Sequence, residues 1–592
     1  MTIFRPKPPF VVLEDSRGHA DARSYVFEDC AQILSVHTLD DVDGALEQIE
    51  SWRQDGYYCA GWLSYETGAA FEQKLQEPEP DLSKEPLIWF AAFKKRRMFK
   101  GSEIENFWRV AQTSLRPFSI TSTRPELAED DYTNAFNAVQ NYIQAGDIYQ
   151  ANITFPCSFE AVGDIVSLYR YIREAQFAGY GALIITENWA ALSFSPELFV
   201  ERKGQTLTTR PMKGTVKRPL TQDADEAAAQ ALKNDEKSRA ENLMIVDLLR
   251  NDLSRIANPG SVKVKSLFEV EHYRTVLQMT STVQCESQAL FPDIIKAIFP
   301  CGSVTGAPKI RAMEIINELE TVPRGIYTGA IGHVAPDEDF SLSVPIRTAV
   351  LDQHGKGRLN VGSGLIADSQ VKQEYEECLT KAAFLNASRG QFDLFETMKW
   401  TPEKGVQMLD RHLNRLGRSA AYFGFQFNEE EARRLLDLGA QIQKMPARVK
   451  LLLSRQGVFS CQFNALPALP QAPLKVSLSK NTVNSDNPFL YHKTTQRDIY
   501  EQARTGTPGF EVILQNERGE ITEGSFTNVF IEKDGTLLTP ALHCGLLPGI
   551  LRETLLADGK CQEAVIHTCD LHSADALYIG NALRGLCKVT LV

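Results

Sequence analysis

Apolar residues recur at helical spacing in two long segments of the chain. The segment from Asp130 to Gly146 predicts an amphipathic helix with one apolar face, formed by Tyr132, Phe136, Val139 and Ile143. The segment 235–256 carries two apolar stripes, one formed by Leu243, Val246, Leu249, Leu253 and Ile256 and the other by Ile245 and Leu248. A helix that is apolar on two sides is expected to be buried.

Shorter apolar runs predict strands. Residues 1–120 mix such runs with prolines, which is typical of strands with few helices. Further strands are expected at 182–185, 192–194 and 198–201. A helical pattern at 374–385 is followed by a polar break at 386–392 and a new strand at 394–400. We therefore expect one module to end near residue 388, and three parts in all: residues 1–120, 121–388 and 389–592.

Composition narrows the class of protein. A chain of 592 residues exceeds one ordinary core, and 43% hydrophobic with 23% charged residues is a globular composition. The net charge of -12 argues against a nucleic-acid partner. The eleven cysteines form no CxxC pairs, and we find neither a signal-peptide pattern nor a membrane span. We expect a multidomain α+β protein of the reducing cytoplasm, without membrane partners.

One lysine lies on a segment constrained by proline and glycine, Arg210-Pro-Met-Lys213-Gly-Thr215. An amine held there can be desolvated or crowded by other cations, which lowers its pKa until it acts as a nucleophile. Taken alone, the run better fits a lysine in an exposed turn. Glu197, in Phe194-Ser-Pro-Glu-Leu-Phe199, taken alone better fits a surface carboxylate of a strand.

An ordered set of short sequence runs resembles a known family. The set comprises the two runs just described, 194–199 and 210–215, together with Gly146–Thr154, Gly302–Lys309, Arg324–Gly332, Pro345–Thr348 and Gly362–Gly364. The set resembles the chorismate-utilising enzymes over residues 10–388, which implies a β-sandwich-like α/β domain. Lys213 favours the branch of aminodeoxychorismate synthase component I, because the anthranilate synthase branch usually has alanine there.

The resemblance assigns roles to these residues. Lys213 attacks C2 of chorismate while the C4 hydroxyl leaves with help from Glu197 as acid and base; ammonia then adds at C4 and expels the lysine. Substrate contacts fall on Thr305, Tyr327, Arg347, Gly362, Ser363 and Gly364. Arginine suits a carboxylate because its planar fork binds both oxygens. The glycine-rich run, interpreted as a turn, can offer backbone N–H groups to a second carboxylate.

A magnesium site is also implied. The family places Mg²⁺ between the counterparts of Glu241 and Glu377, with Glu374 as a further candidate ligand. Glutamates three residues apart share a helix face, and carboxylates with retained waters suit Mg²⁺. Lys381, four residues after Glu377, fits a simple ion-pair partner equally well.

The last two hundred or so residues carry a second resemblance, to the two-lobed fold-type IV pyridoxal-phosphate enzymes. Its five runs are 409–416, 492–495, 521–528, 545–552 and 581–585. Lys493 corresponds to the lysine that binds the cofactor aldehyde, and Glu523 to the acid beside the ring nitrogen. The phosphate contacts fall on Arg415 and on the amides of Ile550 and Leu551 at a helix start. Thr397 is a further candidate hydroxyl. Alone, Arg415 fits a surface ion pair and Lys493 a solvated lysine.

Together the two resemblances imply successive reactions toward 4-aminobenzoate and folate. Chorismate and ammonia give 4-amino-4-deoxychorismate, and a pyridoxal-phosphate lyase removes pyruvate from it. We find no glutamine-amidotransferase motif, so we expect a separate amidotransferase subunit to supply ammonia. Fold-type IV modules commonly form homodimers. Three alternatives stay open: an anthranilate synthase fused to a class IV aminotransferase, a synthase fused to an amino-acid aminotransferase, or a C-terminal scaffold without catalysis.

Overall fold

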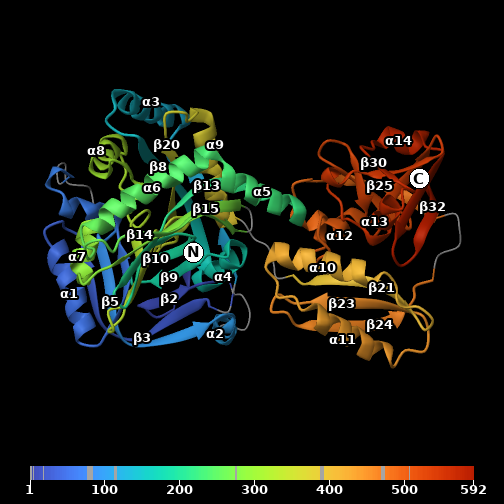
Figure 1. Cartoon of the computed structure of the whole chain (residues 1–592), viewed down its shortest axis with the longest axis horizontal. Helices are drawn as coiled ribbons and strands as arrows, with labels where there is room; N and C mark the ends of the chain where they lie inside the picture. Colours follow the sequence, from blue (N-terminus) through green and yellow to red (C-terminus); the bar gives the residue numbers. More distant parts are fainter. Residues whose placement is uncertain are drawn as a thin grey trace. The chain divides into compact units, whose positions relative to one another are not determined.

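The computed structural model describes residues 3–4, 6–17, 19, 21–75, 85–111, 117–273, 276–386, 392–468, 474–505 and 507–592. The chain forms two compact units (Figure 1). The first comprises Met1–Arg218 and Ala229–Gly390, and the second comprises Pro219–Ala228 and Gln391–Val592. Most of the predicted break at 386–392 lies outside the described residues, and the predicted division near residue 120 stays a prediction.

The first unit is built on twenty strands within the described residues, joined into one pairing network that is almost entirely antiparallel. The strands that position the site are β8 (Gln150–Asp164), β11 (Leu198–Lys203), β13 (Met212–Lys217), β15 (Val276–Glu286), β16 (Gly306–Ala307), β19 (Thr348–Asp352) and β20 (Lys356–Leu365). Strand β20 pairs with β8 along its whole length and with β19 at residues 357–359. These pairings place distant parts of the sequence side by side.

The strands form two layers with an apolar interior. In β4 (Tyr58–Leu63), Ala60 and Trp62 lie in a core made of strand residues, whereas Cys59 and Leu63 pack on the opposite side with helices. The same alternation occurs in β5 (Ile88–Lys100) and β9 (Tyr180–Ile185). Because successive side chains of a strand point to opposite faces, this pattern makes a sandwich with helices on both outer sides. The predicted sandwich-like domain is confirmed.

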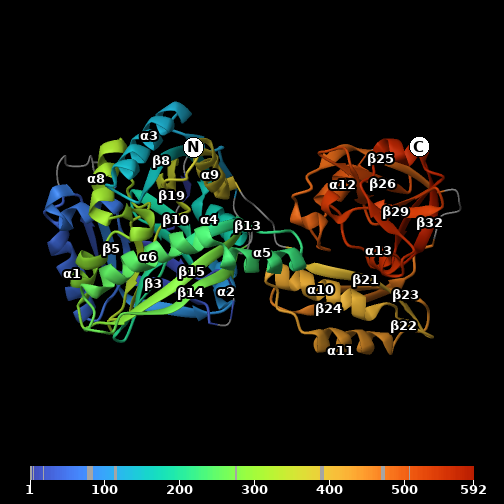
Figure 2. The ribbon, with the colours of Figure 1, turned by 45° about the horizontal axis from the view of Figure 1, so that its top comes forward.

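Helices cover these outer faces. One group comprises α1 (Val42–Gln54), α7 (Phe291–Ile298) and α6 (Glu236–Ser254), and the other comprises α3 (Glu129–Ala145), α4 (Ile165–Gln176), α8 (Lys309–Leu319) and α9 (Val371–Ala382). Helices α3 and α9 lie side by side near β8 and β20 (Figures 1 and 2). Helix α3 confirms the prediction for 130–146: its buried residues are Tyr132, Phe136 and Val139, and it ends at Gly146 with φ 82°.

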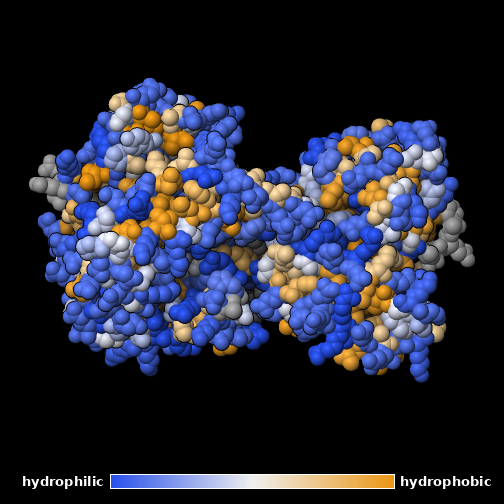
Figure 3. Space-filling model, in the orientation of Figure 1, coloured by the Kyte–Doolittle hydropathy of each residue, from blue (hydrophilic) through white to orange (hydrophobic). Residues whose placement is uncertain are grey.

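Helix α6 also confirms its predicted span, beginning after Asp235, whose side chain accepts a hydrogen bond from the Ser238 amide. The prediction that it is buried on both sides is wrong. Ile245, Val246, Leu249 and Leu253 are buried, but Leu243 is 43% exposed. The helix packs on β13 and β15 and also contacts α7, and Figure 3 shows apolar surface over this part of the first unit.

The second unit has two lobes. In the first lobe, α10 (Leu409–Phe423) and α11 (Glu429–Ala440) pack on a four-stranded sheet of β21 (Leu394–Thr401), β22 (Gly405–Val406), β23 (Ala447–Leu453) and β24 (Phe459–Ala465). In the second lobe, β25 (Leu474–Val483), β26 (Glu511–Asn516), β27 (Ile521–Gly524), β28 (Asn528–Lys533), β31 (Ala576–Asn581) and β32 (Gly585–Leu591) pair in a closed ring. The ring is a small barrel, which confirms the two-lobed expectation.

Two further findings concern sequence expectations. Among the described residues, no helix combines the length and the apolar character needed to cross a membrane. All eleven cysteines are free thiols.

Candidate active sites

Lys213 lies on β13, and its amine faces a cluster of charged groups. Burial and the Lys381 ammonium lower its pKa, against an opposing contribution from the Glu241 carboxylate. Glu197 and Glu377 also act on it through their charges. The amine lies beside the backbone of β20, because a Cβ added at Gly364 would be only 2.9 Å from Lys213 Nζ. A side chain at position 364 would therefore displace the amine.

Glu197 precedes β11 and is 3% exposed. Burial raises its pKa to about 7, so the carboxyl group retains its proton up to near neutral pH. Ser303 donates a 2.6 Å hydrogen bond to Glu197 Oε1. Sequence analysis did not select Ser303, although it lies within the family run 302–309. The arrangement gives a proton donor and an amine in one cluster.

Three of the predicted substrate contacts, Arg347, Tyr327 and Thr305, differ in conformation and in hydrogen bonding. Arg347 has a left-handed backbone with φ 52°, an uncommon conformation for a non-glycine residue, and within the described residues its guanidinium has no hydrogen-bond or ion-pair partner. Burial lowers its pKa. Tyr327 is 7% exposed, and burial raises its pKa. Thr305 is fully buried and donates its hydroxyl to the Cys301 carbonyl at 2.6 Å.

The glycine-rich run 362–364 is not a turn, so that prediction is wrong. Gly362, Ser363 and Gly364 lie in β20 opposite Thr154, Ile153 and Asn152 of β8. On the other side, β19 pairs only with residues 357–359, so within the described chain residues 361–365 have no strand partner on that edge. Edge N–H groups of an unpaired stretch can bind a carboxylate.

The three candidate metal ligands lie on two helices. Glu241 is on α6, whereas Glu374 and Glu377 are on α9. Glu374 accepts a hydrogen bond from Ser369 at 2.8 Å, and Glu377 pairs with Lys381 Nζ at 2.8 Å. Within the described residues, no group of three acidic, histidine or cysteine side chains is placed to hold a metal. One or two carboxylates suffice for a Mg²⁺ that keeps its waters, so Glu241 and Glu377 stay predicted ligands.

Gln150 is a second residue of this region that sequence analysis did not select. It begins β8, is 1% exposed, and neither Oε1 nor Nε2 has a hydrogen-bond partner within the described residues. Its Nε2 lies 3.1 Å from the position of a Cβ on Gly364, the same point that Lys213 Nζ approaches. The sequence run 146–154 indicates that this segment belongs to the site, but it does not single out Gln150 within the segment.

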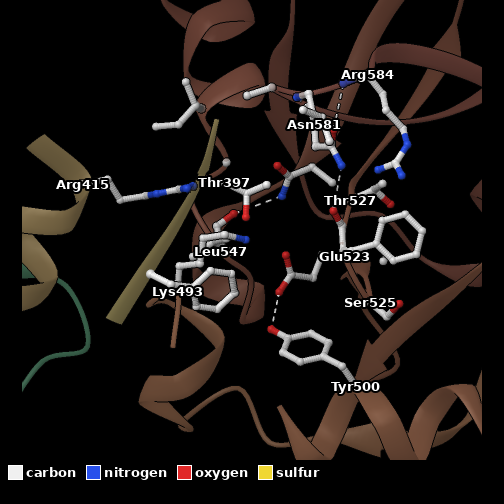
Figure 4. Close-up of a pocket in the computed structure, with 18 of the residues that line it drawn as sticks. Thr397, Arg415, Lys493, Tyr500, Glu523, Ser525, Thr527, Leu547, Asn581 and Arg584 are labelled. Carbon is white, nitrogen blue, oxygen red and sulfur yellow. Dashed lines mark hydrogen bonds between the residues drawn. The ribbon is translucent and has the colours of Figure 1, made fainter. Parts of the chain in front are cut away.

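In the second unit, a cavity of about 370 Å³ is lined by four of the five predicted cofactor residues: Arg415, Lys493, Glu523 and Ile550. Lys493 and Glu523 both line it (Figure 4). Burial and the Arg415 guanidinium lower the pKa of Lys493 to about 7, which favours the neutral amine needed to bind an aldehyde. Burial raises the pKa of Glu523 to about 7, and Tyr500 donates a 2.7 Å hydrogen bond to it. Thr397 also lines the cavity.

Arg415 is held in place by a buried carboxylate. It projects from α10 to Glu396 on β21, with Nε and Nη2 at 2.8 and 2.7 Å, while Nη1 donates to the Pro548 carbonyl at 2.9 Å. His412, one turn earlier on α10, contacts the same carboxylate through Nδ1 at 2.7 Å. The hypothesis of a surface ion pair is wrong, because Arg415 is 5% exposed and Glu396 fully buried.

The residues fit a phosphate group at this end of the cavity. His412 Nε2 is buried without a hydrogen-bond partner within the described chain, and His412 and Arg415 both line the cavity. Helix α13 (Ile550–Ala557) begins here after Gly549, with no side chain capping its first N–H groups. Gly549 and Ile550 line the cavity, whereas Leu551 does not. An uncapped helix start with two basic side chains suits an anion.

Three more arginines line the cavity: Arg448 from β23, Arg497, and Arg584 from the turn between β31 and β32. Arg497 donates to the Ser525 carbonyl. Neither Arg448 nor Arg584 forms an ion pair or hydrogen bond through its guanidinium within the described residues, and both Nε atoms are buried. In Figure 4, Arg584 and Arg415 lie on opposite sides of the view. Burial lowers the pKa of Arg584, and the charge of Arg448 adds to this effect. Unpaired arginines in a cavity suit anionic substrate groups.

Two protein families match different parts of the chain. The model of the chorismate binding enzyme family matches residues 12–387. The chain belongs to the chorismate-binding enzymes. Residues 393–592 match the model of the class IV aminotransferases, so the chorismate-binding unit is followed by a domain of that family.

Individual relatives match the chorismate-binding unit. Aminodeoxychorismate synthase component 1 of Bacillus subtilis is 39% identical over 290 residues, 48% of this chain and 62% of that protein. Anthranilate synthase component 1 of Acetivibrio thermocellus is 37% identical over 292 residues, 48% of this chain and 58% of that protein. The chain therefore spans about three-fifths of these relatives.

One solved structure matches a larger part of the chain than these relatives do. Anthranilate synthase component I from Streptococcus pneumoniae is 25% identical and covers 65% of this chain and 94% of that chain, with a TM-score of 0.53. Both branches of the chorismate-binding enzymes thus occur among the relatives, at similar identity. The choice between them depends on the chemistry of residue 213.

Proposed function

We propose that the chain makes 4-aminobenzoate from chorismate and ammonia in two successive reactions. The first unit converts chorismate and ammonia to 4-amino-4-deoxychorismate and water, and the second unit splits that compound into 4-aminobenzoate and pyruvate. The observation that carries this proposal is the position of Lys213, whose buried amine shares a cluster with the protonatable Glu197. The relative from Bacillus subtilis supports it through its name.

The first reaction uses Lys213 as the nucleophile. Its neutral amine bonds to C2 of chorismate while the bond from C4 to the hydroxyl breaks, and Glu197 gives the departing hydroxyl a proton so that it leaves as water. Ammonia then bonds to C4, the bond between C2 and the lysine nitrogen breaks, and the amine of Lys213 is regenerated. Burial supports both roles, because it lowers the pKa of Lys213 and raises that of Glu197 to about 7.

Anion binding and metal binding complete this site. The unpaired Arg347 and the edge of β20 at residues 362–364 bind the two carboxylates of chorismate. Glu241 and Glu377 would hold Mg²⁺, which would supply positive charge to a substrate carboxylate, and Thr305 and Tyr327 would border the ring. We further propose that a separate glutamine amidotransferase subunit supplies ammonia. The relative's printed name, component 1, supports this, and the test compares glutamine with ammonium as nitrogen source for the purified chain.

The second reaction uses the cavity of the class IV domain. Bound pyridoxal phosphate supplies an electron sink for the substrate carbon that carries the amino group. Lys493 would bind the cofactor aldehyde and remove the proton from C4, Glu523 would interact with the ring nitrogen, and Arg415, His412 and the amides that begin α13 would hold the phosphate. Arg448 and Arg584 suit a substrate with two carboxylates, as 4-amino-4-deoxychorismate has.

The test supplies the purified full chain with chorismate, ammonium, Mg²⁺ and pyridoxal phosphate. We expect 4-aminobenzoate. The variant Lys213→Ala should make no 4-amino-4-deoxychorismate, and Lys493→Ala should accumulate it; Lys217→Ala, an exposed lysine of β13, and Lys475→Ala, an exposed lysine of β25, are the matched controls. Formation of o-aminobenzoate would contradict the proposal and favour the anthranilate synthase alternative.

A second candidate for the class IV domain is amino transfer between amino acids and 2-oxo acids. The family match at residues 393–592 favours it. Incubation with 2-oxoglutarate and an amino acid discriminates the two: amino transfer without pyruvate release from 4-amino-4-deoxychorismate would support this candidate and overturn the lyase.

A further inference from the structure

The side chain of Gln150 has unmet hydrogen-bonding capacity in the interior of the first unit. A carboxamide offers two N–H donors and an oxygen with two lone pairs, and buried groups of this kind are nearly always hydrogen-bonded in folded proteins. Here both polar atoms are buried and neither has a partner within the described residues. Such a group is completed either by an ordered water or by a reactant.

The backbone fixes where this carboxamide lies. Gln150 pairs with Ala307 of β16, and the next residue, Ala151, pairs with Leu365 at the end of β20. The backbone of Gln150 thus lies where β8 pairs with β16, next to the end of β20, and β20 borders Lys213 at Gly364. The Nε2 of Gln150 and Lys213 Nζ approach one point above Gly364, at 3.1 and 2.9 Å. Among the described residues no hydrogen bond fixes which end of the carboxamide faces the amine, so the oxygen can turn toward it.

An uncharged hydrogen-bond acceptor beside Lys213 can orient its amine. A neutral amine carries two N–H groups and one lone pair, so a hydrogen bond accepted from one N–H restricts the direction of the lone pair. The carboxylates that act on Lys213 are Glu241, Glu197 and Glu377, and each stabilises the ammonium form, whereas Lys381 opposes it. An amide oxygen can orient the amine without adding a charge that favours its protonation.

We propose that Gln150 is a positioning residue of the first reaction, whose carboxamide oxygen accepts a hydrogen bond from the Lys213 amine and directs its lone pair at the substrate. This inference rests on the proposed function of the first unit. It adds a residue outside the predicted set, and it assigns the glycine at position 364 a role in keeping the space between the two side chains open.

The experiment compares three variants of the full chain with the wild type. Gln150→Met keeps the length of the side chain and removes its hydrogen bonds, and Gln150→Glu replaces the amide with a carboxylate. Gln284→Met makes the same change at a glutamine of β15 that bonds to Thr208. Formation of 4-amino-4-deoxychorismate from chorismate and ammonium is followed from pH 6 to 9. The fold controls are the melting temperature and the turnover of supplied 4-amino-4-deoxychorismate by the second unit.

We expect Gln150→Met to lower kcat about 10- to 100-fold while KM for chorismate changes less than about twofold, because the lost contact orients the nucleophile and does not bind the substrate. Gln150→Glu should move the rise of kcat/KM to higher pH by about one unit, since its charge raises the pKa of Lys213. Gln284→Met should match the wild type. A purely structural glutamine would not move the pH profile.

The outcomes separate this inference from the function on which it rests. If the wild type forms no 4-amino-4-deoxychorismate from chorismate and ammonium, the proposed function is wrong and this inference falls with it. If the wild type is active but Gln150→Met keeps its kcat, the inference alone is wrong and ordered water satisfies the amide. If Gln150→Met fails to fold, the unshifted pH profile of Gln150→Glu is the result that overturns the inference.

Discussion

Glu197 and Glu396 are both buried carboxylates with opposite titration behaviour. Burial raises the pKa of Glu197 to about 7, and Lys213 and the hydroxyl of Ser303 compensate only in part. Burial acts on Glu396 in the same direction, but Arg415 and His412 lower its pKa to about 2. A carboxyl that keeps its proton can act as an acid, whereas one held ionised by two basic groups serves as an anchor.

The first prediction concerns Glu197 and stability. A carboxyl whose folded pKa is raised favours folding below its unfolded pKa of about 4.5, and this contribution is lost as pH rises through about 7. We expect Glu197→Gln to remove this loss. From pH 5 to pH 8, the free energy of unfolding of the variant should therefore rise relative to that of the wild type by up to about 3 kcal/mol. Urea unfolding at both pH values measures it. Glu201→Gln, on β11, is the control, and equal pH dependence in wild type and Glu197→Gln would contradict the prediction.

The second prediction concerns Glu396. Its lowered folded pKa stabilises the second unit above pH 4.5, and that contribution is lost as pH falls toward 2. Glu396→Gln leaves the Arg415 guanidinium buried without its charge partner, which costs about 3–5 kcal/mol at pH 7. Thermal unfolding of the variant, with a pyridoxal-phosphate titration, should show both lower stability and weaker cofactor binding. Glu429 forms an exposed ion pair with Arg433 on α11. The control Glu429→Gln should change neither the stability nor the free energy of cofactor binding by more than about 0.5 kcal/mol.

At the scale of residues, the motifs led to side chains that the structure places together. Lys493, Glu523 and Arg415 line one cavity and Lys213 lies near Glu197, while their chemical roles stay predictions. Gln150 and Glu396 could not be found, because their importance depends on which side chain lies opposite them in space. Glu396 faces α10 only because alternate residues of β21 point to that side, while Thr397 points to the cavity.

At the scale of elements, local patterns predicted the long helices but not their surroundings. Helices α3 and α6 follow from apolar spacing and from end signals at Gly146 and Asp235. The exposure of Leu243 could not be inferred, because it depends on which strands cover the helix. The run 362–364 resembles a turn in composition, yet its pairing with β8 draws it into a strand.

The third prediction concerns the start of α13. A Cβ at Gly549 would lie 1.8 Å from Asn528 Oδ1, so Gly549→Ala must displace either the Asn528 side chain, which lines the same cavity, or the first turn of the helix. We expect the affinity for pyridoxal phosphate to fall at least about tenfold, since the helix start supplies its anion-binding N–H groups. Equilibrium titration of cofactor absorbance measures the change. Gly559→Ala, in open space after the same helix at φ 67°, should cost about 1 kcal/mol of stability and leave the affinity unchanged.

At the scale of the whole molecule, the chain joins two compact units with separate cores. The sequence indicated two modules because each carries its own ordered motifs. It gave no sign that residues 219–228 group with the second unit, since that short segment follows directly on β13 and has no motif of its own. Leu220 packs in a cluster with Leu490 and Tyr500, and its carbonyl contacts His492 Nε2 at 3.0 Å.

The fourth prediction uses this division. A ligand stabilises the unit that binds it, so pyridoxal phosphate should raise the melting temperature of one unfolding transition and leave the other unchanged. Differential scanning calorimetry of the full chain with and without the cofactor provides the measurement. At 100 times its dissociation constant, the cofactor should add about 2.7 kcal/mol to that transition. The Lys493→Ala chain should show a smaller shift, and equal shifts of both transitions would contradict the prediction.

The excursion of residues 219–228 constrains how the gene can be divided. Because the polypeptide enters the second unit at Pro219, returns to the first at Ala229 and crosses again near residue 390, a single cleavage near 390 does not yield two self-sufficient halves. The N-terminal fragment would keep a decapeptide without its packing partners, and the C-terminal fragment would lose the packing of Leu220 and its contact with His492. Splitting the protein into independent enzymes therefore requires a replacement for that decapeptide as well as a new stop codon.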